Sequence, residues 1–319
     1  ATLTRNVNSP CMVSEGSCPY DFVDSDSWNA WSGKLGFTYA ITNDMRMYAH
    51  WSRGHRSGGY NLRNTAIDTV NLGPGPFDQE TVDSYEIGFK SELGGLGRLN
   101  AAVFYTTIDD MLRELNLADP FAGVVQVIKN TADAEIYGFE VDGTVLLGEY
   151  FTLVGQLGIQ DAERKSYDED CNRVPIGPLG TAGIPGVPPC DGNTINLPAQ
   201  QLPRAPDWNW SLTGIWDQQF GGTRVNASLT ARGQDDFIIS NNLLTGESNV
   251  GQKGYTLVDG RIALEWQFSG GQDRLTVALY GRKMTDKAYK DYELPLGHTG
   301  GLQGGGQPRN YALEVRWDH

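Results

Sequence analysis

A period-two alternation of apolar and polar side chains constrains this chain more than any other feature. In residues 34–41, the larger apolar side chains occupy every second position, as Leu35, Phe37 and Tyr39 show. Successive side chains of a β-strand point to opposite sides of the sheet, so this pattern predicts a strand with one apolar face. No apolar run approaches the roughly 18 residues that a transmembrane helix needs. The sequence therefore argues against a helical membrane protein.

The same alternation recurs along the chain and predicts about eleven strands that pair as hairpins. They cover residues 34–41, 45–51, 84–90, 99–105, 137–142, 151–161, 207–216, 223–235, 255–266, 274–282 and 309–317. Short turns are predicted at 41–44, 93–97, 147–150, 217–222 and 269–273. Long polar loops are predicted over 54–80, 109–130, 162–203, 236–252 and 283–308. This strict alternation of connection lengths is typical of outer-membrane barrels, which have short periplasmic turns and long extracellular loops.

Six charged residues inside the predicted strands fall on the face opposite the aromatic side chains. They are Glu86, Lys90, Glu140, Asp142, Glu314 and Arg316. The inner face of a small soluble barrel would be apolar, so this second face is expected to be wet. Aromatic residues lie toward the predicted strand ends, where a membrane barrel has its aromatic girdles. They are Trp28, Trp31, Trp51, Tyr105, Trp208, Trp210 and Trp317. The predicted fold class is all-β, an antiparallel transmembrane β-barrel.

The charge balance argues against nucleic acid as a partner, and the cysteine pattern argues against zinc. A net charge of -14 with scattered Lys and Arg argues against a surface that tracks nucleic-acid phosphates. Cys11, Cys18, Cys171 and Cys190 form no CxxC pair and lie in polar, Gly/Pro/Ser-rich stretches, which fits zinc ligation poorly. Their local spacing predicts two disulfides in an oxidising compartment, Cys11 with Cys18 and Cys171 with Cys190.

No enzymatic motif was found, and the sequence predicts neither catalytic residues nor a cofactor or metal. The four histidines, His50, His55, His298 and His319, lack the H-E-x-x-H spacing of a zinc protease, and no G-x-S-x-G elbow occurs. Residues 246–253 nearly imitate a P-loop, but an all-β chain lacks the strand-to-helix context that such a loop needs. The acidic run 168–170 is interpreted as a solvated loop rather than a cation site.

Candidate ligand contacts lie where a predicted strand leaves the mouth of the barrel. They are Arg53, His55, Arg56, Tyr60 and Asn61, with His298 added from the glycine-rich stretch 297–306. Cationic and aromatic groups at such a rim can contact an anionic or aromatic ligand. The alternative interpretation is that these groups pair with lipopolysaccharide, with loop acids or with one another.

Several segments resemble successive barrel segments of the TonB-dependent outer-membrane receptors, in that family's order. They are residues 48–61, 80–90, 99–105, 130–140, 202–206 and 308–316. The resemblance extends over roughly residues 28–317 and implies a barrel of about 22 strands plugged by an N-terminal domain. Residues 28–319 are then expected to form the C-terminal half of that barrel, with 1–27 an extracellular loop segment. The plug domain would lie upstream of this chain.

The resemblance implies a place in the outer membrane of a Gram-negative bacterium and a role in transport rather than catalysis. The expected partners are membrane lipid and lipopolysaccharide, a small-molecule ligand, and TonB through the N-terminal part. Siderophore iron, haem, cobalamin and oligosaccharides are all compatible with the family. Two alternatives stay open, a passive porin without a plug and a soluble β-rich binding or adhesion protein. The charges on the second face argue against the soluble protein.

Overall fold

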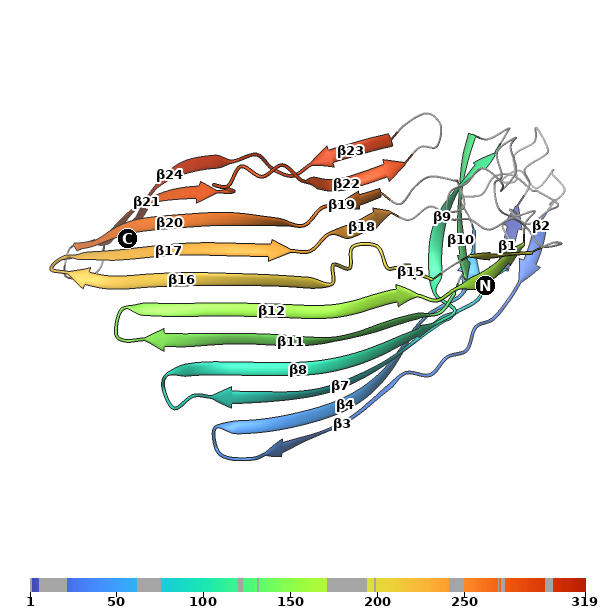
Figure 1. Ribbon diagram of the computed structural model, residues 1–319, viewed down its shortest axis with the longest axis horizontal. Helices are drawn as coiled ribbons and strands as arrows, with labels where there is room; N and C mark the ends of the chain where they lie inside the picture. Colours follow the sequence, from blue (N-terminus) through green and yellow to red (C-terminus); the bar gives the residue numbers. More distant parts are fainter. Residues whose placement is uncertain are drawn as a thin grey trace.

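The computed structural model describes residues 2–5, 22–61, 76–119, 123–130, 132–170, 194–197, 199–240, 250–268, 270, 273–295 and 301–319. These residues form one large antiparallel sheet and several small two-stranded sheets (Figure 1). Within the described ranges, no helix is long and apolar enough to cross a membrane. The all-β prediction is confirmed.

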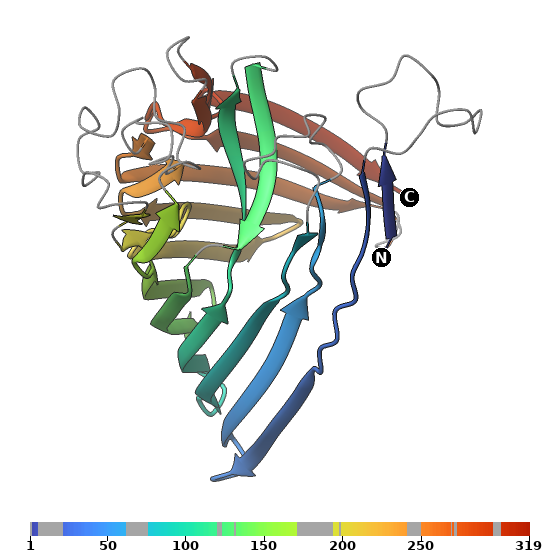
Figure 2. The ribbon, with the colours of Figure 1, turned by 90° about the vertical axis from the view of Figure 1, so that its right-hand side faces the viewer.

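Eleven strands follow one another across the large sheet, in the order β24-β21-β20-β17-β16-β12-β11-β8-β7-β4-β3. Their bounds are β3 (Gly33–Ala40), β4 (Met45–Arg56), β7 (Glu80–Glu92), β8 (Gly97–Asp109), β11 (Ala134–Leu147), β12 (Phe151–Arg164), β16 (Trp208–Phe220), β17 (Thr223–Gln234), β20 (Tyr255–Phe268), β21 (Asp273–Arg282) and β24 (Asn310–Asp318). Each main strand is hydrogen-bonded to main strands near it in the chain, as in a meander, and β15 (Gln200–Gln201) adds a short pairing to β12. Figure 2 shows the sheet curved into an arc that is open on one side.

The short turns lie together at one end of the sheet (Figure 1). Gly148 has a φ of 75°, a left-handed conformation that only glycine adopts at little cost, and it ends β11 where the sequence predicts a turn. One predicted turn, 217–222, is shorter than expected. Strand β16 continues to Phe220 because Asp217 and Gln219 pair with Asn226 and Arg224 across the hairpin. Only Gly221 and Gly222 remain between the strands.

The prediction of long polar loops was wrong in one respect, because these connections contain strands of their own. The clearest case is 109–130, where β9 (Leu112–Asp119) and β10 (Gly123–Asn130) pair along their whole length. Figures 1 and 2 show this hairpin standing at a steep angle to the large sheet. The Val-rich sequence of β10 favours a strand although its surroundings are polar.

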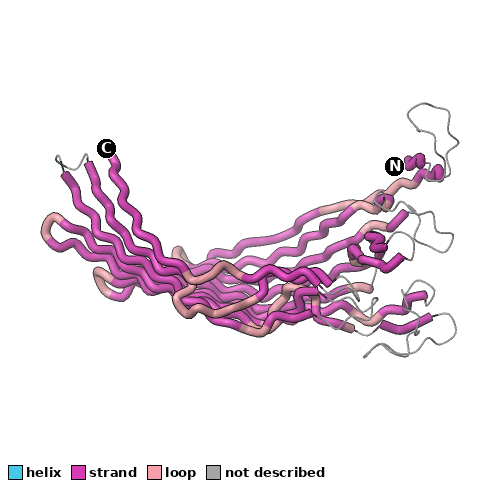
Figure 3. Tube along the Cα trace, turned by 90° about the horizontal axis from the view of Figure 1, so that it is seen from above, coloured by secondary structure: helices cyan, strands magenta, loops and turns pink. Residues whose placement is uncertain are grey.

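The other small sheets lie at the same end as the β9–β10 hairpin, opposite the short turns (Figure 1). They are formed by β1 (Thr2–Arg5) with β2 (Phe22–Ser25), β5 (Gly59–Tyr60) with β6 (Pro76–Phe77), β13 (Tyr167–Asp170) with β14 (Thr194–Leu197), β18 (Phe237–Ser240) with β19 (Val250–Gln252), and β22 (Lys290–Pro295) with β23 (Gly301–Gly305). Figure 3 shows from above that strands make up most of the described chain between the two ends. The four cysteines and His298 lie outside the described residues, so both predicted disulfides stay predictions.

One face of the large sheet is apolar and open to its surroundings. Leu35, Phe37 and Tyr39 on β3 are 73%, 61% and 62% exposed, and Leu313 and Val315 on β24 are each 64% exposed. Contiguous exposed apolar surface of this extent marks a membrane or a protein partner, because water would disfavour it. The predicted alternation of an apolar and a polar face is confirmed.

Aromatic bands border this apolar face at both ends of the strands. Toward the long connections, the register brings into one row Trp51, Tyr85, Tyr105 and Tyr137. Toward the short turns, Phe151 is paired with Trp216, and Phe268 stacks on Trp317 with ring centroids 5.7 Å apart. The ten residue steps from Tyr137 to Leu147 on β11 span about 34 Å along the strand, or about 24 Å at a tilt of about 45°. This matches the apolar band of a membrane barrel.

Candidate functional site

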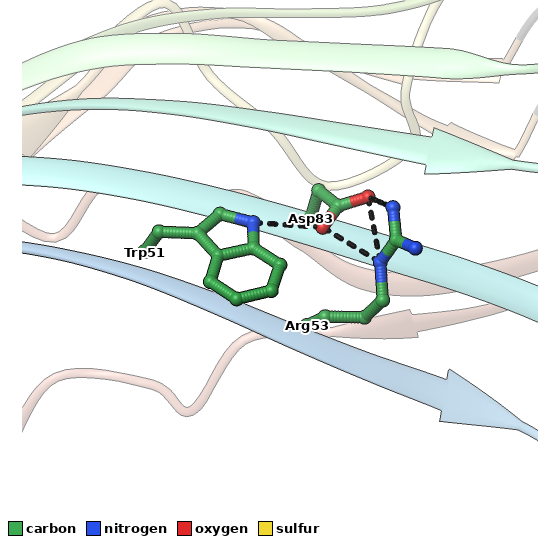
Figure 4. A network of polar contacts seen from close by, with 3 residues as sticks. All are labelled: Trp51, Arg53 and Asp83. Carbon is green, nitrogen blue, oxygen red and sulfur yellow. Dashed lines mark hydrogen bonds and ion pairs between the residues drawn. The ribbon is translucent and has the colours of Figure 1, made fainter. Parts of the chain in front are cut away.

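The predicted rim contacts begin with Arg53, near the end of β4. Its guanidinium forms a bidentate ion pair with Asp83 on β7, in which Nε lies 2.9 Å from Oδ1 and Nη2 contacts Oδ2 (Figure 4). The indole Nε1 of Trp51 donates to the same carboxylate at 2.9 Å. The guanidinium also lies 4.9 Å from the ring centroid of Trp31. Arg53 is therefore already held by two side chains of the chain itself, Asp83 and Trp31, and Trp51 holds the carboxylate of Asp83.

The register also determines which face of the sheet Arg53 occupies. Arg53 pairs with Asp83 two residues beyond the pair of Trp51 with Tyr85, so all four side chains lie on the apolar face. The ion pair thus lies directly beyond the aromatic band on the side of the long connections. Arg56 has the opposite parity and belongs to the polar face. Its Nη1 lies 3.6 Å from Oε2 of Glu80, which also accepts the Leu112 N–H at 2.7 Å.

The other predicted rim residues have different surroundings. Asn61 forms two hydrogen bonds with the backbone of Ile128: its side-chain amide N–H donates to the Ile128 carbonyl at 3.0 Å, and its amide oxygen accepts the Ile128 N–H at 2.6 Å. This joins the chain beyond β5 to β10. The ring of Tyr60 packs edge-on against Trp28, with centroids 5.9 Å apart. His55 is exposed, and its side chain has no hydrogen-bond or ion-pair partner within the described part of the chain. Ligand contact by these residues stays a prediction.

The polar face carries a ladder of hydrogen bonds between side chains of nearby strands. Glu86 accepts from the Tyr48 hydroxyl at 2.6 Å, and Asp142 accepts from the Asn100 amide at 2.9 Å. Near the short turns, Arg224 donates to both carboxylate oxygens of Asp217 at 2.8 Å. The first two contacts confirm the predicted place of Glu86 and Asp142 on this face. Each charge in the ladder has a partner or half-exposed surroundings, as a water-filled interior allows.

A hollow region opens on the polar face toward the long connections, over β16, β17, β20 and β21. It consists of two adjoining hollows of about 650 and 320 Å³ that share Arg232, and we call them together the cationic hollow. The cationic side chains along it are Arg204, Arg232, Arg261, Arg282, Lys283 and Lys290. Only two carboxylates line it, Asp259 and Asp291. This excess of positive charge stands out in a chain whose net charge is -14.

Asp259 anchors the guanidinium of Arg232 and the backbone of Lys283. Its Oδ2 lies 3.1 Å from Nη2 of Arg232, and its Oδ1 accepts the backbone N–H of Lys283 at 2.7 Å. The side chains of Arg232 and Asp259 are 49% and 24% exposed, so the pair stays open to solvent. Arg261 is held differently, by a hydrogen bond of 3.2 Å to Asn226 and by the Tyr280 ring at 5.3 Å.

Aromatic rings form one side of the cationic hollow. Tyr255 and Tyr289 stack with centroids 4.4 Å apart and ring planes 18° from parallel. The Lys283 ammonium lies 4.3 Å from the centroid of the Tyr289 ring and donates to the Tyr289 hydroxyl. Lys283 and Arg204 have φ values of 53° and 61°, which are uncommon for residues other than Gly, Asn and Asp. Such conformations are costly and persist where the surrounding contacts fix them.

Sequence reasoning missed the cationic hollow. The alternation puts Arg232 and Arg261 on the polar face of their strands, but they are far apart in the chain and their proximity depends on register. A search for arginines of equal parity at the same ends of successive hairpins would have indicated it. Among the described residues, no group of three or more His, Cys, Asp or Glu side chains could hold a metal ion.

The eleven-stranded sheet, its exposed apolar face with two aromatic bands and its polar opposite face define part of a membrane-spanning antiparallel β-barrel. The family model for the TonB dependent receptor-like β-barrel matches residues 14–282. The chain belongs to this family and is part of an outer-membrane barrel. Its polar face is accordingly the face of the barrel interior.

The relatives of the chain include proteins that are named as receptors. The pesticin receptor of Yersinia pestis is 24% identical over 264 residues, which are 82% of this chain and 32% of the receptor. The rhizobactin receptor of Rhizobium meliloti is 29% identical over 135 residues, 39% of this chain and 17% of that protein. The relatives are receptors and transporters, not enzymes. This chain spans about a third of the length of the pesticin receptor, to which it is similar over most of its own length.

Solved structures show the same fold at low sequence identity. The ferric yersiniabactin uptake receptor FyuA from Yersinia pestis superposes with a TM-score of 0.63 at 18% identity, over 90% of this chain and 37% of that one. BauA, the ferric preacinetobactin receptor from Acinetobacter baumannii, gives a TM-score of 0.61 at 16% identity, over 96% of this chain and 38% of its own. These likenesses support the fold alone.

Proposed function

We propose that the complete protein takes up a ferric siderophore by TonB-energised transport across the outer membrane. In this proposal, residues 28–319 form the C-terminal half of the barrel and 1–27 an extracellular loop segment. The observation that carries it is the family match over residues 14–282 together with the restriction of the hairpin extensions to one end of the sheet. Groups at that end can collect a scarce ligand from outside the cell.

The contribution of this chain is half of the barrel wall and several capture elements. The apolar face contacts lipid, and the aromatic bands lie at the two interfaces. The ion pair of Arg53 with Asp83 lies beyond the outer band, where it faces lipopolysaccharide. A plug and the segment that contacts TonB belong to the part of the protein outside this chain. Siderophores are favoured over haem, cobalamin and oligosaccharides because the relatives include receptors named for ferric siderophores.

Uptake by cells that carry the full-length receptor tests this proposal. Radioactive iron is supplied as different ferric siderophores, with the inner-membrane energy source intact or removed. Saturable uptake that is lost without the energy source supports energised transport. Uptake that is linear in concentration and unaffected by energy would instead indicate a passive porin. Saturable, energised uptake of haem, cobalamin or an oligosaccharide, with none of iron, would correct the ligand but keep the mechanism.

The predicted rim contacts belong to the same proposal. Arg56 lies at the polar face, and His55 is exposed, whereas Tyr60 and Asn61 pack within the segment beyond β4. Loss of saturable uptake on Arg56→Ala, with normal amounts of receptor in the membrane, would support ligand contact by the rim. Unchanged uptake in Arg53→Ala and Arg56→Ala would assign these arginines to their ion pairs with Asp83 and Glu80.

A further inference from the structure

We propose that the cationic hollow is the ligand site of this half of the barrel, and that its ligand is an anionic chelate with aromatic oxygen donors, such as a phenolate or catecholate. This inference rests on the proposed uptake function and names the chemistry of its cargo. The hollow is defined by Arg204, Arg232, Arg261, Arg282, Lys283 and Lys290 on the interior face.

The cationic hollow concentrates positive charge. Six cationic side chains face two carboxylates here, and Lys290 is additionally paired with Glu293 at 2.6 Å. Like charges held close together repel one another, so folding alone gives no reason to concentrate them. A multiply charged anion in the hollow would relieve this repulsion. Guanidinium groups are suited to the task because their planar donors match carboxylate and catecholate oxygens.

The aromatic side of the cationic hollow offers a surface on which a planar ring can stack. The stacked pair of Tyr255 and Tyr289 offers a flat surface, and Lys283 beside Tyr289 adds a positive charge at its edge. Planar rings of a ligand can stack on such a surface while their oxygens contact cations. A sulfate or phosphate group would use the charges but not the rings. The combination therefore favours an aromatic anion.

Contacts within the chain hold the cationic hollow in shape before any ligand arrives. The Gly306 N–H donates to the Tyr289 carbonyl at 2.9 Å, and a Cβ at Gly306 would lie only 2.1 Å from the Tyr289 ring. The backbone at Lys283 is fixed in a left-handed conformation by its bond to Asp259. Binding groups that are ordered in advance lose less entropy when the ligand binds.

Elsewhere on the interior face, cations also meet aromatic rings, since the Lys90 ammonium lies 5.6 Å from the centroid of the Tyr48 ring and that ring stacks on His50, but they do so at the opposite end of the sheet. Another hollow on β3, β4 and β7 contains Lys34, Arg46 and Lys90 beside Glu86. It lies on the edge strand, and Arg46 and Lys90 are close to the short turn at 41–44, at the end opposite the long connections. Near the same end, Arg224 is neutralised by Asp217. The cationic hollow is at the end from which an external ligand would arrive.

Binding of two iron chelates to the purified complete receptor in detergent micelles tests the inference. The probes are a ferric tris-catecholate with a charge of about -3 and a ferric trihydroxamate of about zero charge. Equilibrium dialysis with radioactive iron gives both dissociation constants at low and high salt. Variants are Arg232→Gln, Arg261→Gln and the double variant. The matched control is Arg98→Gln, which removes an exposed arginine from the interior face of β8 near the short turns.

We expect tighter binding of the tris-catecholate, weakened by salt. The double variant should lose at least about tenfold in affinity for this anion, and Arg98→Gln less than about twofold. Electrophoretic mobility before and after boiling shows whether each variant barrel is folded. Equal binding of the two chelates, no binding of either, or equal losses in Arg98→Gln and the double variant would overturn the inference. Energised iron uptake alongside any of these results would leave the proposed function intact, whereas unenergised uptake with the expected binding would overturn the function and keep the site.

Discussion

Two regions near the long connections carry cationic side chains, but they use their charge differently. In the rim pair, Arg53 is matched by Asp83 on the neighbouring strand and lies on the apolar face. In the cationic hollow, six cations meet two carboxylates on the polar face. A matched pair beside lipid stabilises the wall, whereas an unmatched excess beside water is available to a ligand. Face and charge balance together, rather than proximity to the mouth, distinguish a structural cation from a binding one.

The difference between the rim pair and the cationic hollow depends first on which face of the large sheet contacts water. Leu313 is 64% exposed on the apolar face of β24, opposite Leu279, and Ala312 lies on the other face. In the full-length protein, Leu313→Arg should cost about 2 to 4 kcal/mol near the bilayer midplane, and Ala312→Arg much less because the interior is wet. Urea unfolding in lipid vesicles measures both. Equal costs would reverse the face assignment and with it the comparison.

The rim pair provides the next largest effect. Asp83 accepts hydrogen bonds from the indole N–H of Trp51 and from Nε and Nη2 of Arg53, and its side chain is 8% exposed. Asp83→Ala leaves the indole N–H of Trp51 and the guanidinium of Arg53, whose side chain is 31% exposed, without their acceptor, which should destabilise the receptor by about 1 to 3 kcal/mol in the same unfolding assay. The control is Asp236→Ala, since the pair of Asp236 with Lys253 is 58% and 90% exposed and should cost at most about 1 kcal/mol. Similar losses in the two variants would contradict a structural role for the rim pair.

Removal of a carboxylate from the cationic hollow should strengthen ligand binding, whereas removal of Asp83 weakens the fold. Asp259→Asn removes one of the two carboxylates, while its amide oxygen can still accept the Lys283 N–H. Affinity for the ferric tris-catecholate should rise about three- to tenfold, because one charge about 7 Å away is worth about 1 kcal/mol at an effective dielectric constant of about 40. Asp217→Asn makes the same change near the short turns and should leave affinity unchanged. A fall in affinity on Asp259→Asn would mean that Asp259 orients Arg232 for binding.

The sequence predicted the strands and the two faces well because the period of a strand is local. Leu35, Phe37 and Tyr39 reveal the apolar face without any knowledge of their neighbours. Most strands inside the long connections were missed because they are short, whereas β9 and β10 have eight residues each, as β3 does, and were missed because their surroundings are polar. The parity of Arg53, two residues after Trp51, already placed it on the apolar face, although it was grouped with Arg56 as a ligand contact.

The cationic hollow could not be predicted in the same way. Arg232, Arg261 and Lys283 lie on different strands or beyond them, and their convergence is set by hydrogen-bond register between hairpins. The stacking of Tyr255 on Tyr289 joins a strand to a connection, which no periodicity reveals. A sheet face can be deduced from one strand, but a site on that face needs several strands in register.

A third region, at the base of the β9–β10 hairpin, extends the comparison to an excess of negative charge. Asp110 has a φ of 55°, and its N–H donates to Asp133 at 3.1 Å. Burial and the nearby carboxylates of Asp133, Asp109 and Asp78 raise the pKa of Asp110 above its ordinary value. The folded hairpin base therefore holds this proton more tightly than an open one. Its stability should fall as pH rises from the ordinary pKa through the raised pKa.

Asp110→Asn should remove this pH dependence and stabilise the closed hairpin at neutral pH by a few tenths of a kcal/mol, as expected when one of several nearby like charges is lost. Asparagine tolerates the left-handed conformation, so the backbone need not change. Protection factors from hydrogen exchange on β9 and β10, measured between pH 4 and 7, report the effect. Asp286→Asn is the control, because Asp286 is also left-handed but lies 3.4 Å from the cationic Arg309. If both variants changed protection in the same direction, backbone geometry rather than charge would govern this region, and charge balance would distinguish only the rim pair from the cationic hollow.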